Sequence, residues 1–281
     1  MIIDMHQHTH FHGRSDEELI AHQRKMGISK TVLLPSGSKV NLPSTNDGYS
    51  NGLGCQCTGN EAAYALVQQY PDELAFFACE VPDKPDARQT IEKYLNLGAI
   101  GIGELKFNLQ VDSKPMRLMY DIAMDFDVPV LMHFQHGLFY SLEYDRMSSM
   151  LEAYPTVNFI GHAQTWWGNI DKHHDQEIRH PKGRVTAGGI TDRLMHDYPN
   201  IYADHSAGSG LTALTRDEEH TVGFLQRHQD QLLFGTDCAD AVGHGEACQG
   251  SQTLATLRRL APGEDILQKI LCLNAKKLFK I

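Results

Sequence analysis

The sequence has few basic side chains and no long apolar run. Its 281 residues include 25 Lys and Arg against 35 Asp and Glu, which gives a formal net charge of −10. Nucleic acids and anionic membrane surfaces are bound by clusters of basic side chains, so we expect neither as a partner. No apolar stretch approaches the roughly 18 residues that cross a bilayer, and the opening MIIDMHQHTH lacks the basic-then-apolar order of a signal peptide. We therefore expect a cytoplasmic protein.

Cysteine and aromatic residues are scarce as well. Aromatic residues make up 8% of the chain, and the hydrophobic fraction of 41% is typical of a globular protein with a buried core. The cysteines are scattered over a medium-length chain, whereas disulfide frameworks belong to short secreted domains, so reduced thiols are expected. Cys55 and Cys57 form a C-x-C in a Gly-rich segment, which favours a tight loop over a metal site, because structural zinc usually has a second ligand pair nearby. The six cysteines are Cys55, Cys57, Cys79, Cys238, Cys248 and Cys272.

Short apolar runs rich in β-branched residues recur at nearly even spacing, and helical patterns alternate with them. Most runs are almost continuously apolar, which is typical of parallel strands buried on both faces. Ser15, with Glu18 three residues later, predicts the start of the first helix, and Gly27 predicts its end. The eight predicted strands are 1–8, 30–35, 74–81, 99–107, 128–134, 157–163, 200–206 and 231–237. The predicted helices are 15–27, 59–71, 86–98, 114–126, 141–155, 190–199, 214–229 and a two-part helical end from about 246 to 280.

This strict alternation predicts parallel strands joined by right-handed crossovers. Eight such units fit a single (β/α)8 TIM barrel, an α/β fold, with residues 1–281 as one domain. An open doubly wound sheet usually has a glycine-rich phosphate loop after its first strand, and here that position holds His6-Gln7-His8. Two connections are long, 36–59 after the second strand and 163–189 after the sixth. Both follow strands, and we expect them on the barrel face where active sites are built.

Histidine is unusually frequent, with 16 residues, and several histidines stand where strands end. An H-x-H pair alone is weak evidence in such a chain, but two residues that are two apart on a strand point to the same face. Carboxylates occupy the same position on two further strands. Buried imidazoles and carboxylates at this density cost several kcal/mol unless a cation compensates them, so we predict one metal site. Its predicted ligands are His6, His8, Glu104, His133, His162 and Asp237.

Nitrogen and oxygen ligands suit a divalent metal, with Zn²⁺ as our first expectation and Mn²⁺, Fe²⁺ or Co²⁺ as alternatives. A catalytic metal keeps a position open for water, whose pKa then falls to about 7, and Asp237 can take the proton of that water. Two layouts stay open. In the first, Glu104 bridges two ions. In the second, one ion is held by His6, His8, His133 and Asp237, and His162 is free to act as an acid–base group. Lys106 shares the face of Glu104 and is expected first to pair with the carboxylates. The alternatives for Lys106 are oxyanion stabilisation and a carbamylated bridging ligand.

Secondary candidates lie near the same strand ends. Asp204, His205 and Ser206 end the seventh strand, where one of them could contact a substrate or an ordered water. Trp166 and Trp167 are the only tryptophans and lie in the long connection after the sixth strand. A substrate-facing wall and simple packing of that connection are equally good interpretations of this pair.

Six motifs carry a family resemblance: D-x-H-x-H at 4–8, GIGELKF at 101–107, PVLMH at 129–133, IGHA at 160–163, FGTD at 234–237 and LNAKKLF at 273–279. Their order over essentially the whole chain resembles the amidohydrolase superfamily, and within it the amidohydrolase-2 group of TIM-barrel metal-dependent hydrolases and related decarboxylases. The resemblance implies a second-metal or catalytic role for His162. It implies metal binding by His6, His8, His133 and Asp237. The Gly-Glu of GIGEL is also similar to TatD-type metallo-nucleases, in which such a Glu binds metal, while other members carry a carbamylated Lys on the fourth strand.

We therefore expect an enzyme with a small-molecule substrate. The favoured reaction is hydrolysis of an amide, lactone or similar ester-type bond, with Asp237 as general base and His162 and Lys106 as further catalytic residues. One alternative is non-oxidative decarboxylation of a small carboxylic acid on the same metal site. Another is a metal-storing or regulatory protein without catalysis. The acidic balance counts against a nuclease, and the chain is compatible with a homo-oligomer.

Overall fold

The computed structural model describes residues 1–45, 57–138 and 140–281, and it contains the eight predicted strands in the predicted order. All of their pairings are parallel. Each strand is shorter than its apolar run, because the run continues past the hydrogen-bonded part of the strand. The strands are β1 (Ile3–Gln7), β2 (Lys30–Leu33), β3 (Leu74–Phe76), β4 (Ile102–Leu105), β5 (Val130–His133), β6 (Phe159–His162), β7 (Ile201–Asp204) and β8 (Leu232–Leu233).

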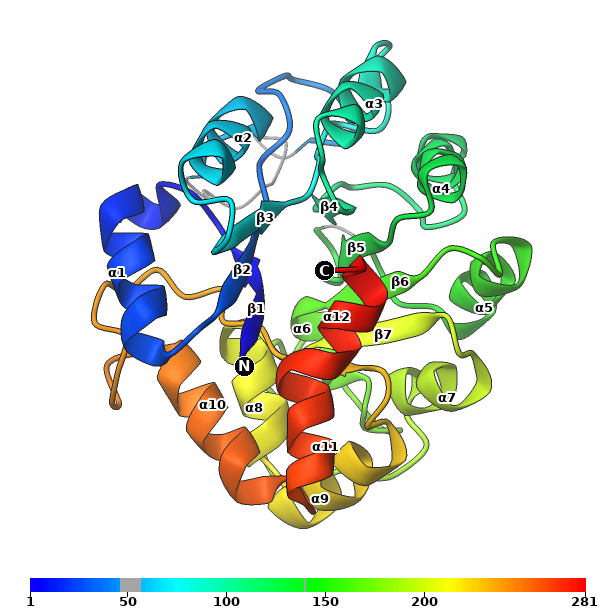
Figure 1. Cartoon of the computed structure of the whole chain (residues 1–281). Helices are drawn as coiled ribbons and strands as arrows, with labels where there is room; N and C mark the ends of the chain where they lie inside the picture. Colours follow the sequence, from blue (N-terminus) through cyan, green and yellow to red (C-terminus); the bar gives the residue numbers. More distant parts are fainter. Residues whose placement is uncertain (46–56, 139) are drawn as a thin grey trace.

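The strands pair as two sheets, β1–β2–β3 and β4–β5–β6–β7–β8. Individual backbone hydrogen bonds connect these sheets at both seams. Between β3 and β4, the Gly103 amide donates to the Ala78 carbonyl at 2.9 Å. Between the segment after β8 and β1, the Asp237 amide donates to the His6 carbonyl at 2.8 Å. The chain thus forms the predicted TIM-barrel arrangement, with a ladder that is interrupted at two seams (Figure 1).

The helices follow the prediction through most of the chain. The first begins at Ser15, whose side chain forms a capping box with Glu18, and ends at Gly27 in the left-handed conformation with φ of 75°. Within the described ranges, no helix combines the length and the apolar character that crossing a membrane requires. The helices that match are α1 (Asp16–Met26), α2 (Asn60–Gln69), α3 (Ala87–Asn96), α4 (Lys114–Phe126), α5 (Tyr144–Ala153), α7 (Ile190–Asp197) and α10 (Gln249–Leu260). A short helical turn that was not predicted, η1 (Phe11–Gly13), precedes α1.

Three segments differ from the prediction. The helix predicted at 214–229 forms as α9 (Glu218–Arg227), and an additional helix, α8 (Ala207–Thr215), precedes it; Asp217 separates the two, because it leaves the helical conformation and caps α9 by accepting from the His220 amide. The connection 163–189 begins with a short helix, α6 (Ala163–Gly168). The C-terminal part after α10 has three pieces: α11 (Glu264–Gln268), η2 (Lys269–Leu273) and α12 (Asn274–Phe279). Part of the other long connection, 46–56, lies outside the described residues, as does Cys55, whereas the described cysteines carry free thiols.

An inner apolar layer fills the barrel directly below a polar layer. Side chains two residues apart on a strand share a face, so a residue of the apolar layer is followed on the same face by one nearer the carboxyl end. On three neighbouring strands that next residue is polar and buried. The pairs are Leu131 and His133, Ile160 and His162, and Tyr202 and Asp204. The strand pattern therefore places polar groups together at one end of the barrel.

Helix α12 closes the opposite end of this inner layer. Leu278 and Phe279 are buried in the same cluster as Ile3, at the start of β1. The ring of Phe279 meets that of Phe77 edge-on, with centroids 5.6 Å apart. Figure 1 shows α12 (red) lying across the middle of the ring of strands, near the N-terminus. The amino-terminal mouth of the barrel is thus filled by the chain itself.

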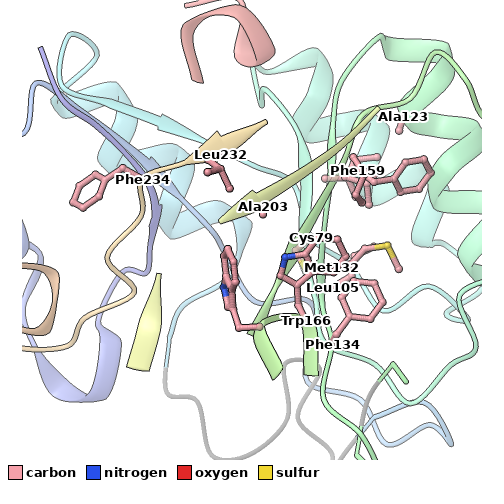
Figure 2. Close-up of a cluster of buried hydrophobic side chains, with 14 of the residues drawn as sticks. Cys79, Leu105, Ala123, Met132, Phe134, Phe159, Trp166, Ala203, Leu232 and Phe234 are labelled. Atoms are coloured by element: carbon pink, nitrogen blue, oxygen red, sulfur yellow. The ribbon is translucent and has the colours of Figure 1, made fainter. Parts of the chain in front are cut away.

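A second, larger apolar cluster packs the helices against the outside of the strands. Figure 2 shows part of it, including Phe134 and Trp166, whose stacked rings have centroids 5.7 Å apart. Gly161 allows this packing, because a Cβ there would lie 2.3 Å from the Trp166 ring. Both tryptophans are buried, and Trp167 donates from Nε1 to the Asp204 carbonyl at 2.9 Å. The structure therefore supports the packing interpretation for Trp166, and it places Trp167 against the polar layer.

Candidate metal centre

The six predicted ligands meet at the carboxyl ends of the strands. They come from β1 and the residue after it, from β4, β5 and β6, and from the segment after β8. The side chain of Asp237 is 11% exposed and the other five are buried. Their candidate ligand atoms form overlapping groups in which all atoms lie within 4.8 Å of one another. The groups are His6, His8 and Glu104; His6, His162 and Asp237; and Glu104, His133 and His162.

One part of the centre is built on the two histidines of the H-x-H motif. Nε2 of His6 and Nε2 of His8 lie 3.3 Å apart. Oδ1 of Asp237 is 3.3 Å from Nε2 of His8 and 3.7 Å from Nε2 of His6. Oε2 of Glu104 lies 3.5 Å and 3.6 Å from the same two nitrogens of His6 and His8. Separations of about 3 to 4 Å are expected between atoms that share one ion at about 2 Å.

The other part is formed around the second oxygen of Glu104. Oε1 lies 2.7 Å from Nδ1 of His133 and 3.4 Å from Nε2 of His162. Nε2 of His133 contacts Oε1 of Gln135 at 3.1 Å. The two oxygens of Glu104 thus face two different pairs of histidines, which is the geometry of a carboxylate that bridges two ions.

Hydrogen bonds at Nδ1 orient three of the imidazoles. Asp204 Oδ2 is 2.6 Å from Nδ1 of His6 and 3.2 Å from Nδ1 of His162. The Ser206 hydroxyl donates to the same carboxylate oxygen at 2.7 Å. Nδ1 of His8 lies 2.6 Å from the Leu34 carbonyl. An N–H at Nδ1 leaves the lone pair on Nε2, so these three rings present Nε2 to the centre, as metal-binding histidines do.

Lys106 lies at the edge of the centre. Its Nζ is 2.8 Å from Oε2 of Glu104, which is the pairing expected first from the sequence. Lys106 is buried, with 7% of its surface exposed. A neighbouring carboxylate favours the charged form of a buried ammonium, and a charged ammonium stabilises negative charge on neighbouring atoms.

The carboxylates of the centre are held ionised. Burial alone would raise the pKa of Asp237, but the positive charge of His6, the contact with His8 and the charge of Lys106 lower it below its usual range. The pKa of Glu104 is likewise lowered, against burial, by Lys106, His6 and His133. Burial also acts to lower the pKa of His6, yet the surrounding carboxylates outweigh it and raise that pKa. The centre thus concentrates negative charge around His6, which favours a positive charge at this position.

These properties fit a divalent cation. The carboxylates of Glu104, Asp204 and Asp237 and the ammonium of Lys106 give the centre a formal charge of −2 when the imidazoles are neutral. Such a charge is costly inside a protein unless a cation balances it. Oε2 of Glu104, although paired with Lys106, and Oδ1 of Asp237 accept no hydrogen bond of good geometry from the described residues. Both atoms belong to the group around His6 and His8, so they are available as metal ligands.

Asp204 is the residue that sequence reasoning ranked too low. It stands at the end of β7, the same position as the histidines of β5 and β6, and it is fully buried. That shared position was the available signal. His205, the next residue, stacks on Trp167 with ring centroids 4.4 Å apart, and burial lowers the pKa of its imidazole to about 4.

Comparison with known proteins agrees with this fold. The family profile described as Amidohydrolase matches residues 3–281. An uncharacterized TIM-barrel protein from Bordetella bronchiseptica has a TM-score of 0.63 at 20% identity, over 95% of this chain and 83% of the other. A 2,6-dihydroxybenzoate decarboxylase from Rhizobium has a TM-score of 0.60 at 15% identity, over 99% of this chain and 98% of the other. A probable 2-pyrone-4,6-dicarboxylic acid hydrolase from Acinetobacter baumannii, with citric acid bound, has a TM-score of 0.61 at 12% identity, over 100% and 99%.

No curated protein sequence matches the chain significantly. At these identities the structural matches establish the fold alone, and they include a decarboxylase and a probable hydrolase. The family match covers nearly the entire chain, and it agrees with the order of motifs and with the candidate ligands gathered at the strand ends. The chain belongs to the amidohydrolase family of metal-dependent TIM-barrel enzymes that act on small molecules.

Proposed function

We propose that the chain is a metal-dependent hydrolase that cleaves an amide, lactone or related ester-type bond in a small molecule. The observation that carries this proposal is the position of Glu104. Its Oε2 faces His6 and His8, and its Oε1 faces His133 and His162. A carboxylate placed between two groups of ligands suits a pair of divalent ions, the arrangement that clamps both the attacking and the leaving oxygen in hydrolysis.

Divalent ions held there, with Zn²⁺ as the first expectation and Mn²⁺ or Fe²⁺ as alternatives, would lower the pKa of water to about 7. Asp237 would accept a proton from the attacking water, because its carboxylate is ionised and its Oδ1 faces the centre next to Nε2 of His8. The same carboxyl then returns the proton to the leaving group. Asp237 therefore acts as general base and then as general acid.

Two further side chains assist in this proposal. His162 is held at Nδ1 by Asp204 and Ser206, so Nε2 faces the reacting bond and the oxygens of Glu104. The Lys106 ammonium stabilises the negative charge that develops on the carbonyl oxygen. Lys106 also balances Glu104, which explains why both are buried together.

Decarboxylation of a small carboxylic acid is the second candidate. It is favoured by the similarity in fold to a 2,6-dihydroxybenzoate decarboxylase over nearly the whole of both chains. In that reaction Lys106 would pair with the substrate carboxylate, and His162 would protonate the carbanion that remains after CO₂ leaves.

One experiment separates the candidates. The full-length protein, with its metal content measured, is incubated in ¹⁸O-labelled water with a panel of lactones, amides and hydroxybenzoic acids, and products are analysed by mass spectrometry and headspace CO₂. Hydrolysis predicts one ¹⁸O in the carboxyl group that is formed and two ions per chain in the candidate metal centre. CO₂ release with no ¹⁸O in the remaining organic product would support decarboxylation instead, and metal uptake with no turnover by the wild-type protein on any substrate would support a binding protein.

A further inference from the structure

A second cluster of ligand-type side chains lies where the connection between β8 and α10 meets α1. His22 is on α1, Cys238 and Asp240 are in the connection, and Cys248 precedes the first residue of α10. One ligand atom from each of the four lies within 4.8 Å of all the others. His22, Cys238 and Cys248 are buried, and the Asp240 side chain is 22% exposed. This cluster shares no residue with the candidate metal centre.

The cluster is arranged around Nε2 of His22. This nitrogen lies 3.3 Å from Sγ of Cys238, 3.3 Å from Sγ of Cys248 and 3.5 Å from Oδ1 of Asp240. Ligands of a tetrahedral zinc ion are expected about 3.3 to 3.8 Å apart, given Zn–N and Zn–O bonds near 2.0 Å and Zn–S bonds near 2.3 Å. The three distances from His22 therefore lie within the range of one closed tetrahedral site, and the other ligand atoms lie within 4.8 Å of one another.

Hydrogen bonding alone does not satisfy this arrangement. A neutral imidazole nitrogen carries either one hydrogen or one lone pair, so Nε2 of His22 can serve only one of its three neighbours. Thiols are weak hydrogen-bond partners, and two of them are buried here against one imidazole. A cation at the centre would be bound by all four groups at once.

The surrounding residues hold the ligands in place. The backbone amide of Ser251 donates to Sγ of Cys248 at 3.3 Å. Arg14 donates from Nη1 to the carbonyls of Cys238 and Asp240, at 2.8 Å and 3.1 Å. Its positive charge offsets the excess negative charge of two thiolates and one carboxylate around a divalent ion. Supporting contacts of this kind fix the direction of metal ligands.

The connection itself needs an anchor. Residues 234–248 are all described, and they form no helix or strand. Gly243, with φ of 70°, brings the connection against α1 so closely that a Cβ would lie 2.9 Å from the His22 carbonyl. The amides of Val242 and Gly243 donate to Oδ1 of Asp240, at 2.9 Å and 3.2 Å, and so hold the carboxylate in the cluster.

We propose that His22, Cys238, Asp240 and Cys248 bind a structural Zn²⁺ ion that ties the β8–α10 connection to α1. Four protein ligands leave no open position, which distinguishes a structural from a catalytic site. Two thiolates select Zn²⁺ over Mg²⁺ or Mn²⁺. Because Cys238 follows Asp237 directly, this ion fixes the backbone next to the proposed general base.

Cobalt substitution tests the site without relying on activity. The full-length chain is expressed in medium that supplies Co²⁺ in place of Zn²⁺, and its near-ultraviolet spectrum is recorded. The candidate catalytic centre contains no sulfur, so thiolate-to-cobalt charge-transfer absorption reports on the cysteine site. We expect this absorption in the wild-type protein and in Cys272→Ser, a matched buried thiol outside the cluster, and its loss in Cys238→Ser and Cys248→Ser.

Metal analysis of zinc-grown protein gives a second readout. We expect Cys248→Ser to contain one ion fewer per chain than the wild type, with Cys272→Ser unchanged. If the cluster variants fail to fold, the wild-type cobalt spectrum alone decides. Bound Co²⁺ without thiolate absorption would overturn the proposal, as would a disulfide between Cys238 and Cys248, detected as two missing thiols in freshly purified denatured protein.

Discussion

Oδ2 of Asp204 lies 2.6 Å from Nδ1 of His6, and this contact sets the direction in which the His6 ring faces. The same carboxylate reaches Nδ1 of His162 at 3.2 Å, so one side chain on β7 orients imidazoles from β1 and β6. The charges of His6 and His162 lower the pKa of Asp204 below its usual range, although burial acts to raise it. Asp204 is thus an ionised carboxylate behind two candidate ligands.

Replacing Asp204 with Asn removes this charge while keeping the shape of the side chain. We expect metal affinity to fall by about 10- to 100-fold, as for other carboxylates that orient metal-binding histidines. Isothermal titration of the metal-depleted protein measures this directly. Asp230→Asn, at a carboxylate that is 72% exposed, serves as the control and should bind metal like the wild type. Equal affinities for Asp204→Asn and the control would show that the contact does not orient a ligand.

Glu104→Gln tests the bridging role. The amide has one carbonyl oxygen and no charge, so it cannot hold two ions as the carboxylate can. We expect the variant to contain at least one ion fewer per chain than the wild type, as measured by inductively coupled plasma mass spectrometry on the purified proteins. An unchanged metal content in this variant would contradict a bridge at Glu104.

Asp237→Asn tests the general base. Asp237 has φ of 46°, and Asn is one of the few residues that tolerate this left-handed conformation, so the backbone should persist. We expect kcat to fall by about 10²- to 10⁴-fold, the usual contribution of a general base. Thermal unfolding of the variant is the control for the fold. A wild-type rate on a verified substrate would rule out this role.

Gly235→Ala tests how tightly the centre is packed. A Cβ at this position would lie 2.4 Å from Oδ1 of Asp204 and 3.0 Å from Cβ of His6. We expect a loss of about 1 to 3 kcal/mol in the free energy of unfolding, because overpacking forces neighbours apart. Gly223→Ala on α9 is the matched change, since its Cβ would meet only the flexible end of Arg227 at 3.3 Å. Urea unfolding should therefore show a lower free energy of unfolding for Gly235→Ala, and either a gain or a clearly smaller loss for Gly223→Ala.

Asp192 on α7 is expected to make stability depend on pH. It accepts hydrogen bonds from Nε2 of His228 at 2.6 Å and from Arg227 at 3.1 Å. Burial acts to raise the pKa of Asp192, but these contacts lower it to about 2, against an ordinary value of 3.8. A carboxyl with a lowered pKa stabilises the fold above its unfolded value and loses that contribution as the pH falls toward its folded value.

Asp192→Asn should therefore lower the free energy of unfolding by about 2 kcal/mol at pH 7, and by about half as much at pH 3. Urea unfolding at the two pH values measures this difference. The control is Asp230→Asn, which should show a small effect at both. A deficit for Asp192→Asn that is equal at pH 7 and pH 3 would mean that the ionisation of Asp192 is not the source of the stability.

The sequence predicted the strands and the gathering of the site better than it predicted the supporting contacts. Apolar runs identify buried parallel strands, and side chains at their ends meet because all strands run the same way, as at His133 and His162. A short helix such as α6 gives no such pattern, because it follows β6 directly and its core-facing residue, Trp166, is equally suited to a loop. The sequence showed that Asp204 ends the seventh strand, but it did not show that the carboxylate of Asp204 contacts His6 and His162.

The cluster at His22 shows why some sites escape sequence analysis. His22 lies between Leu19 and Met26 on the buried face of α1, so its spacing indicates a core position. Its two cysteine neighbours are 216 and 226 residues away in the chain. Only the folded arrangement of the connection after β8 brings these groups together.

Helix α12 also bears on how a substrate of the proposed enzyme reaches the candidate metal centre. Leu278 and Phe279 are buried in the inner layer at the amino-terminal end of the strands, so the chain itself blocks that end. Under the proposed function, substrate would enter and product would leave at the carboxyl ends of the strands, where the connections after the strands lie. Exchange of those connections should therefore change selectivity while the barrel beneath stays unchanged.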